Sequence, residues 1–227
     1  MAKKKRIRIE AIKSFKNVSQ QPEAWKGKWK TSVFGNDHEI VLELGCGHGN
    51  YTIELAQRFP QKNYIGLDLK GARLWVGAKK ALDAGMTNVF FIRGNAAHLT
   101  TMFELGEISE IWLPFPDPYP KKPRKWLTST LFLEIYRQIC TPDAVLHFKT
   151  DDDALYRSTL DSLALYGCRI LYNFSDLYRS NFADDLPYIQ TTYEKRHLAA
   201  GKTIKYIRFQ LPFDSDHSQN MPQPSRL

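Results

Sequence analysis

The stretch Glu39–Phe59, EIVLELGCGHGNYTIELAQRF, decides the fold. It begins with an apolar run, passes through three glycines at alternate positions, Gly45, Gly47 and Gly49, and continues as an amphipathic segment of helical length. Glycines at this spacing let the backbone turn sharply and approach a ligand closely. We therefore expect a strand, a ligand-binding loop and a helix in direct succession.

The same alternation continues toward the C-terminal part of the chain. The apolar runs NYIGLDL, NVFFIR, EIWLPF and AVLHFK alternate with amphipathic segments, and CRILYNF and IKYIRFQL close the series. This pattern predicts an α/β, Rossmann-like fold with a mostly parallel central sheet and helices on both faces. No good helix separates the last two strands in the sequence, so we expect an antiparallel strand pair at one edge.

One domain accounts for most of the chain. Residues 39–213 carry the strand and helix pattern, residues 1–38 read as a basic and partly flexible N-terminal arm, and residues 214–227 read as a disordered tail. The net charge of +8 favours a polyanionic partner. The KKKRIR run in the arm is either a solvated charge run or a loose nucleic-acid contact.

The remaining composition excludes several classes of protein. Cys46, Cys140 and Cys168 lie far apart without a CxxC pair, which argues against a zinc site and against a disulfide framework. No apolar run reaches the roughly 20 residues of a membrane span, and MAKKKRIRIE lacks the apolar region of a signal peptide. We expect a cytoplasmic protein without a metal; monomer and homodimer both remain open.

The glycine loop points to a particular ligand. Ligands of open parallel sheets bind beyond the carboxyl ends of the strands, and this loop reads ELGCGHGN, with Glu43 two residues ahead of the first glycine. A dinucleotide-binding turn would place its third glycine one position later. The spacing resembles motif I of class I methyltransferases, which bind S-adenosylmethionine. The rival interpretation is a tight strand-to-helix turn.

Two further polar residues follow predicted strands. Asp68 ends the second strand, where a carboxylate can accept hydrogen bonds from both hydroxyls of a ribose. Asn95 follows the third strand and offers both a donor and an acceptor to an adenine edge. The alternatives are a helix-capping aspartate and an ordinary turn asparagine.

The segment Trp112–Trp126, WLPFPDPYPKKPRKW, follows the fourth strand. Its five prolines predict a stiff loop that holds Asp117 over the ligand pocket. Tyr119 and Trp126 offer faces on which a base can stack. The basic residues suited to phosphate contacts are Lys121, Lys122, Arg124 and Lys125. We interpret the segment as an RNA-binding loop, against the alternative of a proline-shaped loop with a solvated basic face.

These motifs together resemble one family. FPDPYPKKPRKW is similar to the FPDPWxKKRHxKRR signature of bacterial tRNA (guanine-N7-)-methyltransferases, KTDD at Lys149–Asp152 is similar to the family's TD, and TTYEKRHLAAGKTI resembles its TxFExRxxxxGxxI stretch. Tyr119 and Pro120 replace the common Trp-His, and the basic run is shorter. The resemblance implies S-adenosylmethionine-dependent methylation of N7 of a guanosine in the variable loop of tRNA.

The resemblance also implies roles for individual residues. Asp117 matches the proposed catalytic residue. The positions that contact or shape the S-adenosylmethionine pocket are Glu43, Gly45, Gly47, Gly49, Asp68, Asn95 and Asp117. The positions assigned to the substrate are Lys121, Asp151, Thr191, Thr192, Tyr193 and Glu194, and those facing the RNA backbone are Lys122, Arg124 and Lys125.

Other functions remain as alternatives. An exocyclic-amine methyltransferase carries a DPPY-type motif at the same place, whereas this segment reads DPYP. A catalytically silent RNA-binding protein of the same fold would not need the acid and glycines of the loop. A nicotinamide-dependent oxidoreductase conflicts with the glycine spacing. We hypothesise that Asp117, Asp151 or Glu194 accepts hydrogen bonds from the guanine N1–H and exocyclic amine.

Overall fold

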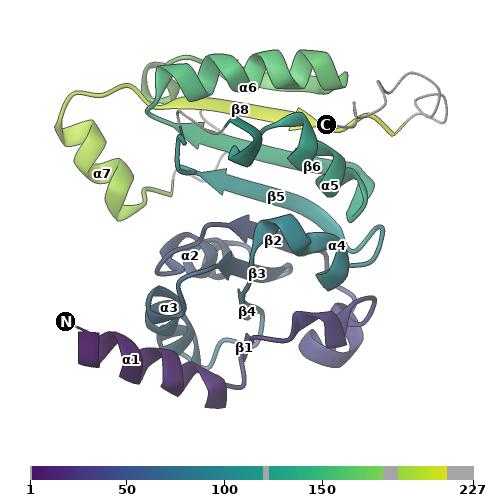
Figure 1. Cartoon of the computed structure of the whole chain (residues 1–227), viewed down its shortest axis with the longest axis vertical. Coiled ribbons are helices and arrows are strands. Elements are labelled where there is room, and N and C mark those ends of the chain that lie inside the picture. The colour runs from purple at the N-terminus through teal and green to yellow at the C-terminus, as the bar shows by residue number, and fades with distance from the viewer. Residues whose placement is uncertain (1, 120–122, 181–188, 214–227) are drawn as a thin grey trace, which may run out of the picture.

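A single eight-stranded sheet organises the protein. The computed structural model describes residues 2–119, 123–180 and 189–213, and the predicted tail, residues 214–227, lies outside them. The sheet has the order β1-β4-β3-β2-β5-β6-β8-β7 (Figure 1). The strands are β1 Val18–Ser19, β2 Ile40–Leu44, β3 Asn63–Asp68, β4 Val89–Arg93, β5 Ile108–Pro114, β6 Cys140–Thr150, β7 Arg169–Phe174 and β8 Lys205–Gln210.

The strand order reverses between β2 and β5. From β2 the chain builds outward through β3 to β4, then returns to place β5 on the other side of β2, with Glu43 opposite Trp112. All pairs from β1 to β6 are parallel, and β8 is antiparallel to both β6 and β7. The predicted antiparallel edge is confirmed. The reversal creates a crevice at the carboxyl ends of β2 and β5, where open parallel sheets bind ligands.

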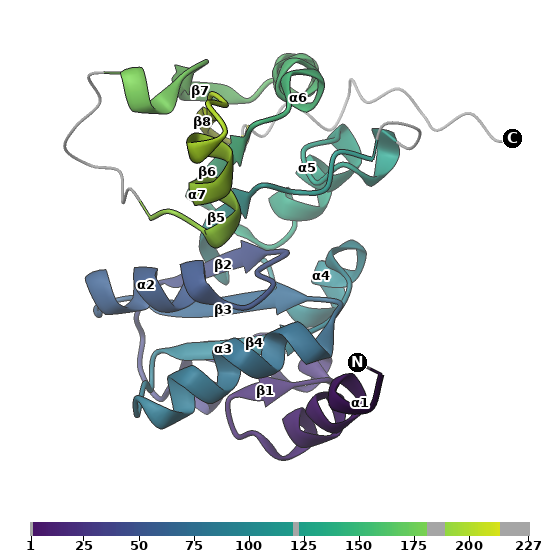
Figure 2. The same cartoon turned by 90° about the vertical axis from the view of Figure 1, so that its left-hand side faces the viewer.

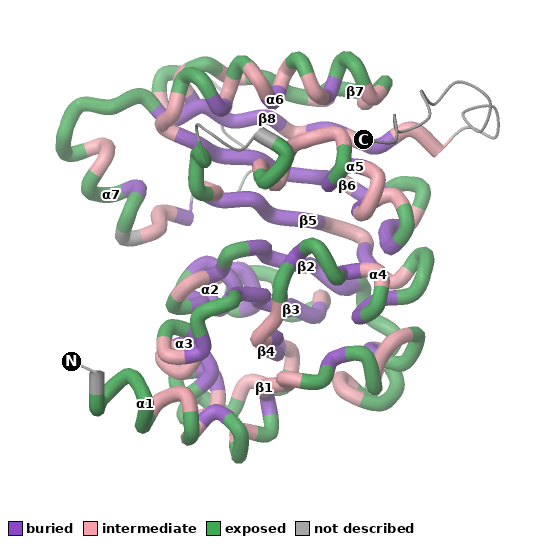
Figure 3. The backbone as a smooth tube through the Cα atoms, in the orientation of Figure 1, coloured by how far each residue is buried: buried purple, intermediate pink, exposed green. Residues whose placement is uncertain are grey.

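Helices cover both faces of this sheet, as the sequence predicts. Helices α2 and α3 lie on one face, and α4, α5 and α6 lie on the other (Figure 2). Their bounds are α2 Asn50–Arg58, α3 Gly71–Asp83, α4 Leu99–Met102, α5 Thr130–Arg137 and α6 Asp153–Tyr166. Figure 3 shows the central strands as almost continuously buried, whereas helix α1 (Ala2–Ala11) and most of helix α7 (Thr192–Ala199) are exposed. The apolar strand runs of the sequence are therefore the two-sided core of a parallel sheet.

The N-terminal segment, expected as a partly flexible arm, contributes packed elements in its described part. It forms helix α1 Ala2–Ala11, a 3₁₀ turn Ile12–Ser14 and strand β1, which pairs with β4. Further along, the fully buried Trp29 donates its indole N–H to the carbonyl oxygen of Met102 at 2.9 Å. The domain boundary at residue 38 stays a prediction, but residues on its N-terminal side belong to the core.

A short helix also lies where the sequence predicts none. Helix α7, Thr192–Ala199, is inserted between β7 and β8 and projects beyond the carboxyl ends of β5 and β6 (Figure 1). Its side chains are mostly exposed, so it lacks the broad apolar stripe that would have marked it in the sequence. The expectation that no helix separates these two strands was wrong.

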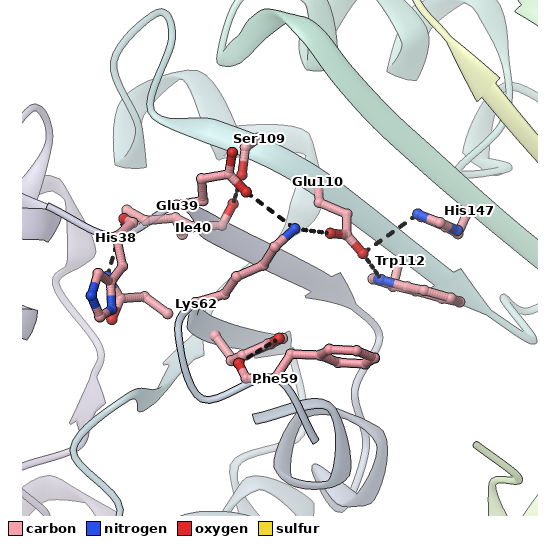
Figure 4. A network of polar contacts seen from close by, with 11 residues as sticks. His38, Glu39, Ile40, Phe59, Lys62, Ser109, Glu110, Trp112 and His147 are labelled. Atoms are coloured by element: carbon pink, nitrogen blue, oxygen red, sulfur yellow. Dashed lines mark hydrogen bonds and ion pairs between the residues drawn. The ribbon is translucent and has the colours of Figure 1, made fainter. Parts of the chain in front are cut away.

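At the opposite, amino-terminal edge a polar network joins residues at or next to four strands, β2, β3, β5 and β6 (Figure 4). Lys62 Nζ lies 3.1 Å from a carboxylate oxygen of Glu39 and 2.9 Å from one of Glu110. Glu110 also accepts the indole N–H of Trp112 at 2.5 Å and lies 3.4 Å from His147 Nε2. Burial lowers the pKa of His147 to about 4, so this imidazole is neutral at neutral pH. This network ties strand ends together far from the glycine loop.

No helix in the described ranges is both long enough and apolar enough to cross a membrane.

Candidate active site

The three glycines of the loop divide into two kinds. All three have positive φ, of 72° at Gly45, 57° at Gly47 and 68° at Gly49, which other residues adopt only with strain. A Cβ added at Gly45 would meet no atom within 4 Å, and one at Gly47 would meet only a carbonyl oxygen at 4.0 Å. A Cβ at Gly49 would overlap the ring of Phe91 at 2.5 Å. Gly45 and Gly47 thus leave open space before the backbone, whereas Gly49 permits close packing.

Glu43 lies under this loop and is 3% exposed. Its Oε2 accepts hydrogen bonds from both the backbone N–H and the hydroxyl of Thr52, in the first turn of α2. Burial raises the pKa of the Glu43 carboxyl to about 7, although the hydrogen bonds from Thr52 act in the opposite direction. Glu43 therefore fixes the start of α2 against the end of β2.

Asp68 joins the glycine loop to the next helix. Its Oδ2 accepts the N–H of Gly47 at 2.9 Å, and its Oδ1 accepts the N–H of Lys70 at 2.6 Å. Asn95 lies at the end of β4, and its Oδ1 accepts the N–H of Ala97 at 3.0 Å. Both residues therefore have the local capping roles considered as alternatives. Each carboxylate oxygen can accept a second hydrogen bond, and the Asn95 amide group still offers a donor.

The loop after β5 presents Asp117 at the same edge. Phe115 has a φ of 54°, which is strained for a non-glycine residue, and its N–H donates to the carbonyl oxygen of Lys149 at 2.8 Å. Asp117 is exposed, and its Oδ2 accepts the hydroxyl of Tyr119 at 3.0 Å. The indole of Trp126 donates to the Tyr119 carbonyl oxygen at 2.9 Å. These contacts, as well as the prolines, hold Asp117 in place.

Part of the predicted RNA-binding loop can be placed. Lys121 and Lys122 lie outside the described residues, whereas Arg124 and Lys125 are exposed in the 3₁₀ turn Pro123–Lys125. Trp126 packs against the apolar core, so the predicted stacking role is less suited to it than to Tyr119, which is 45% exposed.

Asp151, directly after β6, is contacted by two basic side chains. Its Oδ2 lies 2.7 Å from His197 Nδ1 and 2.7 Å from Lys202 Nζ. Partial burial acts to raise the pKa of Asp151, but the hydrogen bond from Lys202 and electrostatic interaction with His197 and Lys202 together lower it. Asp151 therefore ties the C-terminal end of α7 to the end of β6.

Helix α7 carries the rest of the predicted substrate residues. The hydroxyl of Thr191 caps the helix by accepting the N–H of Glu194 at 3.0 Å, and the side chain of Thr192 is not described. Tyr193 is 52% exposed, and its ring lies 4.1 Å from His197 and 5.7 Å from Phe115, between ring centroids. An exposed aromatic face backed by two other rings is suited to stacking against a base.

Glu194 faces the interior, where it meets a residue that the sequence analysis did not select. Its Oε1 lies 2.5 Å from Lys149 Nζ, and both side chains have no solvent exposure. The hydroxyl of Tyr178 donates to the same oxygen at 2.8 Å, whereas Oε2 is buried and has no hydrogen-bond partner among the described residues. Lys149 could have been found from the sequence, because a lysine inside the apolar run AVLHFK needs a buried anion.

The structure thus gathers the predicted residues at the carboxyl edge of the sheet. Glu43 and Asp68 flank the glycine loop, while Asp117, Asp151 and Glu194 follow β5, β6 and the α7 cap. Lys149 of β6 lies opposite Pro114, the last residue of β5, and its side chain reaches Glu194. In the described part of the chain, no group of three or more His, Cys, Asp or Glu side chains is placed to hold a metal ion.

The chain is similar to known proteins over most of its length. A family model described as "Putative methyltransferase" matches residues 37–207. A tRNA (guanine-N(7)-)-methyltransferase of Bacteroides thetaiotaomicron is 47% identical over 195 residues, which cover 86% of this chain and 77% of that protein. One of Christiangramia forsetii is 43% identical over 221 residues, which cover 92% of this chain and 99% of that protein.

Solved structures share the fold at low sequence identity. The 16S rRNA methyltransferase KamB matches with a TM-score of 0.59 at 14% identity, over 82% of this chain and 94% of that chain. A geranyl diphosphate C-methyltransferase of Streptomyces coelicolor, solved with S-adenosyl-L-homocysteine, matches with a TM-score of 0.55 at 13% identity, over 84% and 81%. The predicted class I methyltransferase fold is confirmed. On the identity to its curated relatives, the chain belongs to the tRNA (guanine-N(7)-)-methyltransferase family.

Proposed function

We propose that this protein transfers a methyl group from S-adenosylmethionine to N7 of a guanosine in the variable loop of tRNA. The observation that carries the proposal is the meeting of two surfaces at the point where the strand order reverses. One is the open backbone of Gly45 and Gly47, bounded by Glu43 and Asp68. The other is the exposed loop of Asp117, beside the aromatic face of Tyr193.

The residues at this edge fit S-adenosylmethionine. The space before Gly45 and Gly47 would be narrowed by any side chain at these positions, which suits close approach of a ligand to the backbone. The carboxylate of Asp68 has lone pairs left for ribose hydroxyls, and the Asn95 amide can donate to an adenine ring nitrogen. The bound cofactor supplies a methyl group made electrophilic by its sulfonium charge.

The acceptor atom, guanine N7, needs little chemical activation by the protein. Guanine N7 carries a lone pair in the plane of the ring, so no side chain has to remove a proton before the methyl group is transferred. The protein contributes by positioning, and well-oriented intramolecular reactions gain about 7–11 kcal/mol in this way. Tyr193 can stack on the base while the strained turn at Phe115 holds Asp117 beside it.

The contacts of the three candidate carboxylates support different roles. Asp151 is contacted by His197 and Lys202 and Glu194 is buried against Lys149, whereas Asp117 is exposed. Within the described residues only the Tyr119 hydroxyl binds its carboxylate, so Oδ1 is available to an incoming N–H. We therefore assign to Asp117 the hydrogen bonds from guanine N1–H and the exocyclic amine, which adenine cannot make in that position.

The test is a methylation assay on unmodified tRNA. The purified protein is incubated with S-adenosylmethionine and tRNA, and the methylated nucleoside and its position are identified by mass spectrometry. 7-Methylguanosine in the variable loop is expected. A methyl group on an exocyclic amine would replace the proposal by the neighbouring methyltransferase class. Cofactor binding without methylated product would favour a silent RNA-binding protein.

Asp117→Asn separates the assigned role from a role in the cofactor pocket. We expect turnover to fall by about 100-fold, because an amide presents an N–H to the base where an acceptor is needed. The affinity for S-adenosylmethionine, measured by calorimetry, should change little. Equal losses of turnover and cofactor affinity would overturn the assignment and place Asp117 in the cofactor pocket.

A further inference from the structure

Helix α1 presents an unpaired basic surface, which we define as Lys3, Lys4, Lys5 and Arg6. All four side chains are exposed. Within the described residues none of them forms an ion pair with a carboxylate, although surface lysines elsewhere do: Lys13 pairs with Glu10 at 2.9 Å, and Lys79 with Asp83 at 2.8 Å. This basic surface therefore carries four positive charges that the described protein does not neutralise.

The helix itself is unfavourable for these charges. They occupy its first half, where the helix dipole is positive, and there is no acid in its first turn. Lys3 and Arg6 are three residues apart, so like charges also repel along one side of the helix. An anionic partner would remove both penalties. The sequence alone left open whether this run is a solvated charge run or a nucleic-acid contact.

Packing on α3 holds the helix in spite of its charge. Ile12, just beyond α1, is fully buried and would lie 2.8 Å from a Cβ added at Gly71. The guanidinium of Arg8 lies over the Trp75 ring, 4.6 Å from its centroid. Gly71 is only three residues from Asp68 of the cofactor site. The basic surface is thus fixed relative to the active site through one short stretch of chain.

The basic surface and the site face the same side of the molecule. In Figure 1 the N-terminal end of α1 projects to the left, as do helix α7 and the arrowheads of β5 and β6. Helices α1 and α7 lie at different ends of the sheet: α1 packs on α3, near β4, whereas α7 follows β7 at the other end of the strand order. A ligand that bridges them must be large, anionic along its length and rigid enough to reach both.

We propose that the basic surface of α1 binds backbone phosphates of the same tRNA whose guanosine enters the active site, so that the enzyme recognises a folded RNA. This inference rests on the proposed function. Lysine and arginine contacts to phosphates release counterions from the nucleic acid, and each contact adds about 0.7–0.9 to the steepness of the salt dependence of binding. Such contacts position the substrate and carry no base specificity.

The experiment compares two triple variants of the full chain. Lys3→Gln, Lys4→Gln and Arg6→Gln remove charge from the basic surface. The control replaces Lys28, Lys30 and Arg169 by Gln, which lowers the net charge equally. These three are at least partly exposed and form no ion pair in the described structure. They lie away from the carboxyl edge: Lys28 and Lys30 flank Trp29, whose backbone N–H donates to Glu107 ahead of β5, and Arg169 begins β7 opposite Gln210. The measured quantities are KM and kcat for tRNA, the salt dependence of tRNA affinity, and S-adenosylmethionine affinity.

For the α1 variant we expect KM for tRNA to rise about tenfold and the log–log salt slope to fall by about 2. Its kcat and cofactor affinity should match the wild type, and the control should behave as the wild type throughout. If tRNA binding weakened equally in both variants, the effect would come from net charge alone and the inference would be overturned. Unchanged tRNA binding in both variants would overturn it as well. A wild-type protein that methylates no tRNA would instead overturn the proposed function.

Discussion

At the scale of single residues, Glu43 shows how burial sets the protonation of a site carboxylate. Its pKa is raised from 4.5 to about 7, so the folded protein binds this proton more tightly than the unfolded chain does. The free energy of unfolding should therefore fall as the pH rises from about 5 to about 7, by roughly 3 kcal/mol in total. Urea unfolding of wild type and Glu43→Gln across this range checks it. An unchanged pH dependence in the variant would contradict the prediction.

The buried pair of Lys149 and Glu194 predicts an asymmetry between single and double variants. Lys149→Met leaves the Glu194 carboxylate buried without its cation, so we expect a loss of about 3–5 kcal/mol in the free energy of unfolding. Lys149→Met combined with Glu194→Leu removes both charges and should recover most of that loss. Chemical denaturation of the three proteins measures it. A double variant as unstable as the single one would show that the pair is not the cause.

The same two residues show what could be predicted about the site and what could not. The glycine loop, Asp68 and Asp117 could be placed from the sequence because each follows a strand, and strand ends of one sheet meet. The contacts of Glu194 could not be placed. The sequence can show that Lys149 needs a buried anion, but only the tertiary structure shows that Lys149 and Tyr178 both reach Glu194. For that reason Glu194, expected to face the substrate directly, is found buried.

At the scale of elements, the close approach of α3 to the glycine loop can be tested at Gly77. A Cβ there would lie 2.5 Å from the carbonyl oxygen of His48 and 3.0 Å from the Phe91 ring. Glycine to alanine in a helix ordinarily stabilises by about 1 kcal/mol, but this overlap with backbone should reverse the sign. We expect Gly77→Ala to lower both the free energy of unfolding and the affinity for S-adenosylmethionine.

Gly94→Ala is the matched control for Gly77→Ala. The nearest atom to its added Cβ is the terminal methyl carbon of Met102 at 2.8 Å, which belongs to a flexible side chain that can move away. Urea unfolding and calorimetry should therefore give values near those of the wild type. If Gly77→Ala also left cofactor affinity unchanged, the packing of α3 would not determine the shape of the loop.

Periodicity predicted the central elements and missed those that depend on neighbours. Strands β2 to β6 are apolar runs because both faces are covered, and such runs are visible in a sequence. Strand β1 has only two residues and is defined by its pairing with β4. Helix α7 is held by the contacts of Asp151 and Glu194 more than by an apolar stripe. Local sequence patterns cannot predict such tertiary contacts.

At the scale of the whole molecule, the N-terminal segment should divide into two functional parts. Removing residues 2–10 takes away the basic surface but leaves Ile12, β1 and Trp29. We expect Tm to fall by less than about 4 °C, which is the change that a loss of roughly 1 kcal/mol in the free energy of unfolding produces at this chain length. The affinity for tRNA should drop. Differential scanning calorimetry and tRNA binding at fixed salt measure the two effects.

Removing residues 2–38 should have a different outcome. This deletion removes the fully buried Trp29, whose ring centroid lies 5.5 Å from that of Phe90 and 5.4 Å from that of Phe103. It also removes β1 and so leaves the edge of β4 unpaired. Loss of a large aromatic side chain from a core costs about 3–5 kcal/mol on its own, and an unpaired apolar strand edge promotes aggregation. We therefore expect no cooperative unfolding transition, whereas removing residues 214–227 should leave Tm unchanged. A stably folded protein lacking residues 2–38 would show that the segment is an arm after all, and that the core of the domain begins at β2.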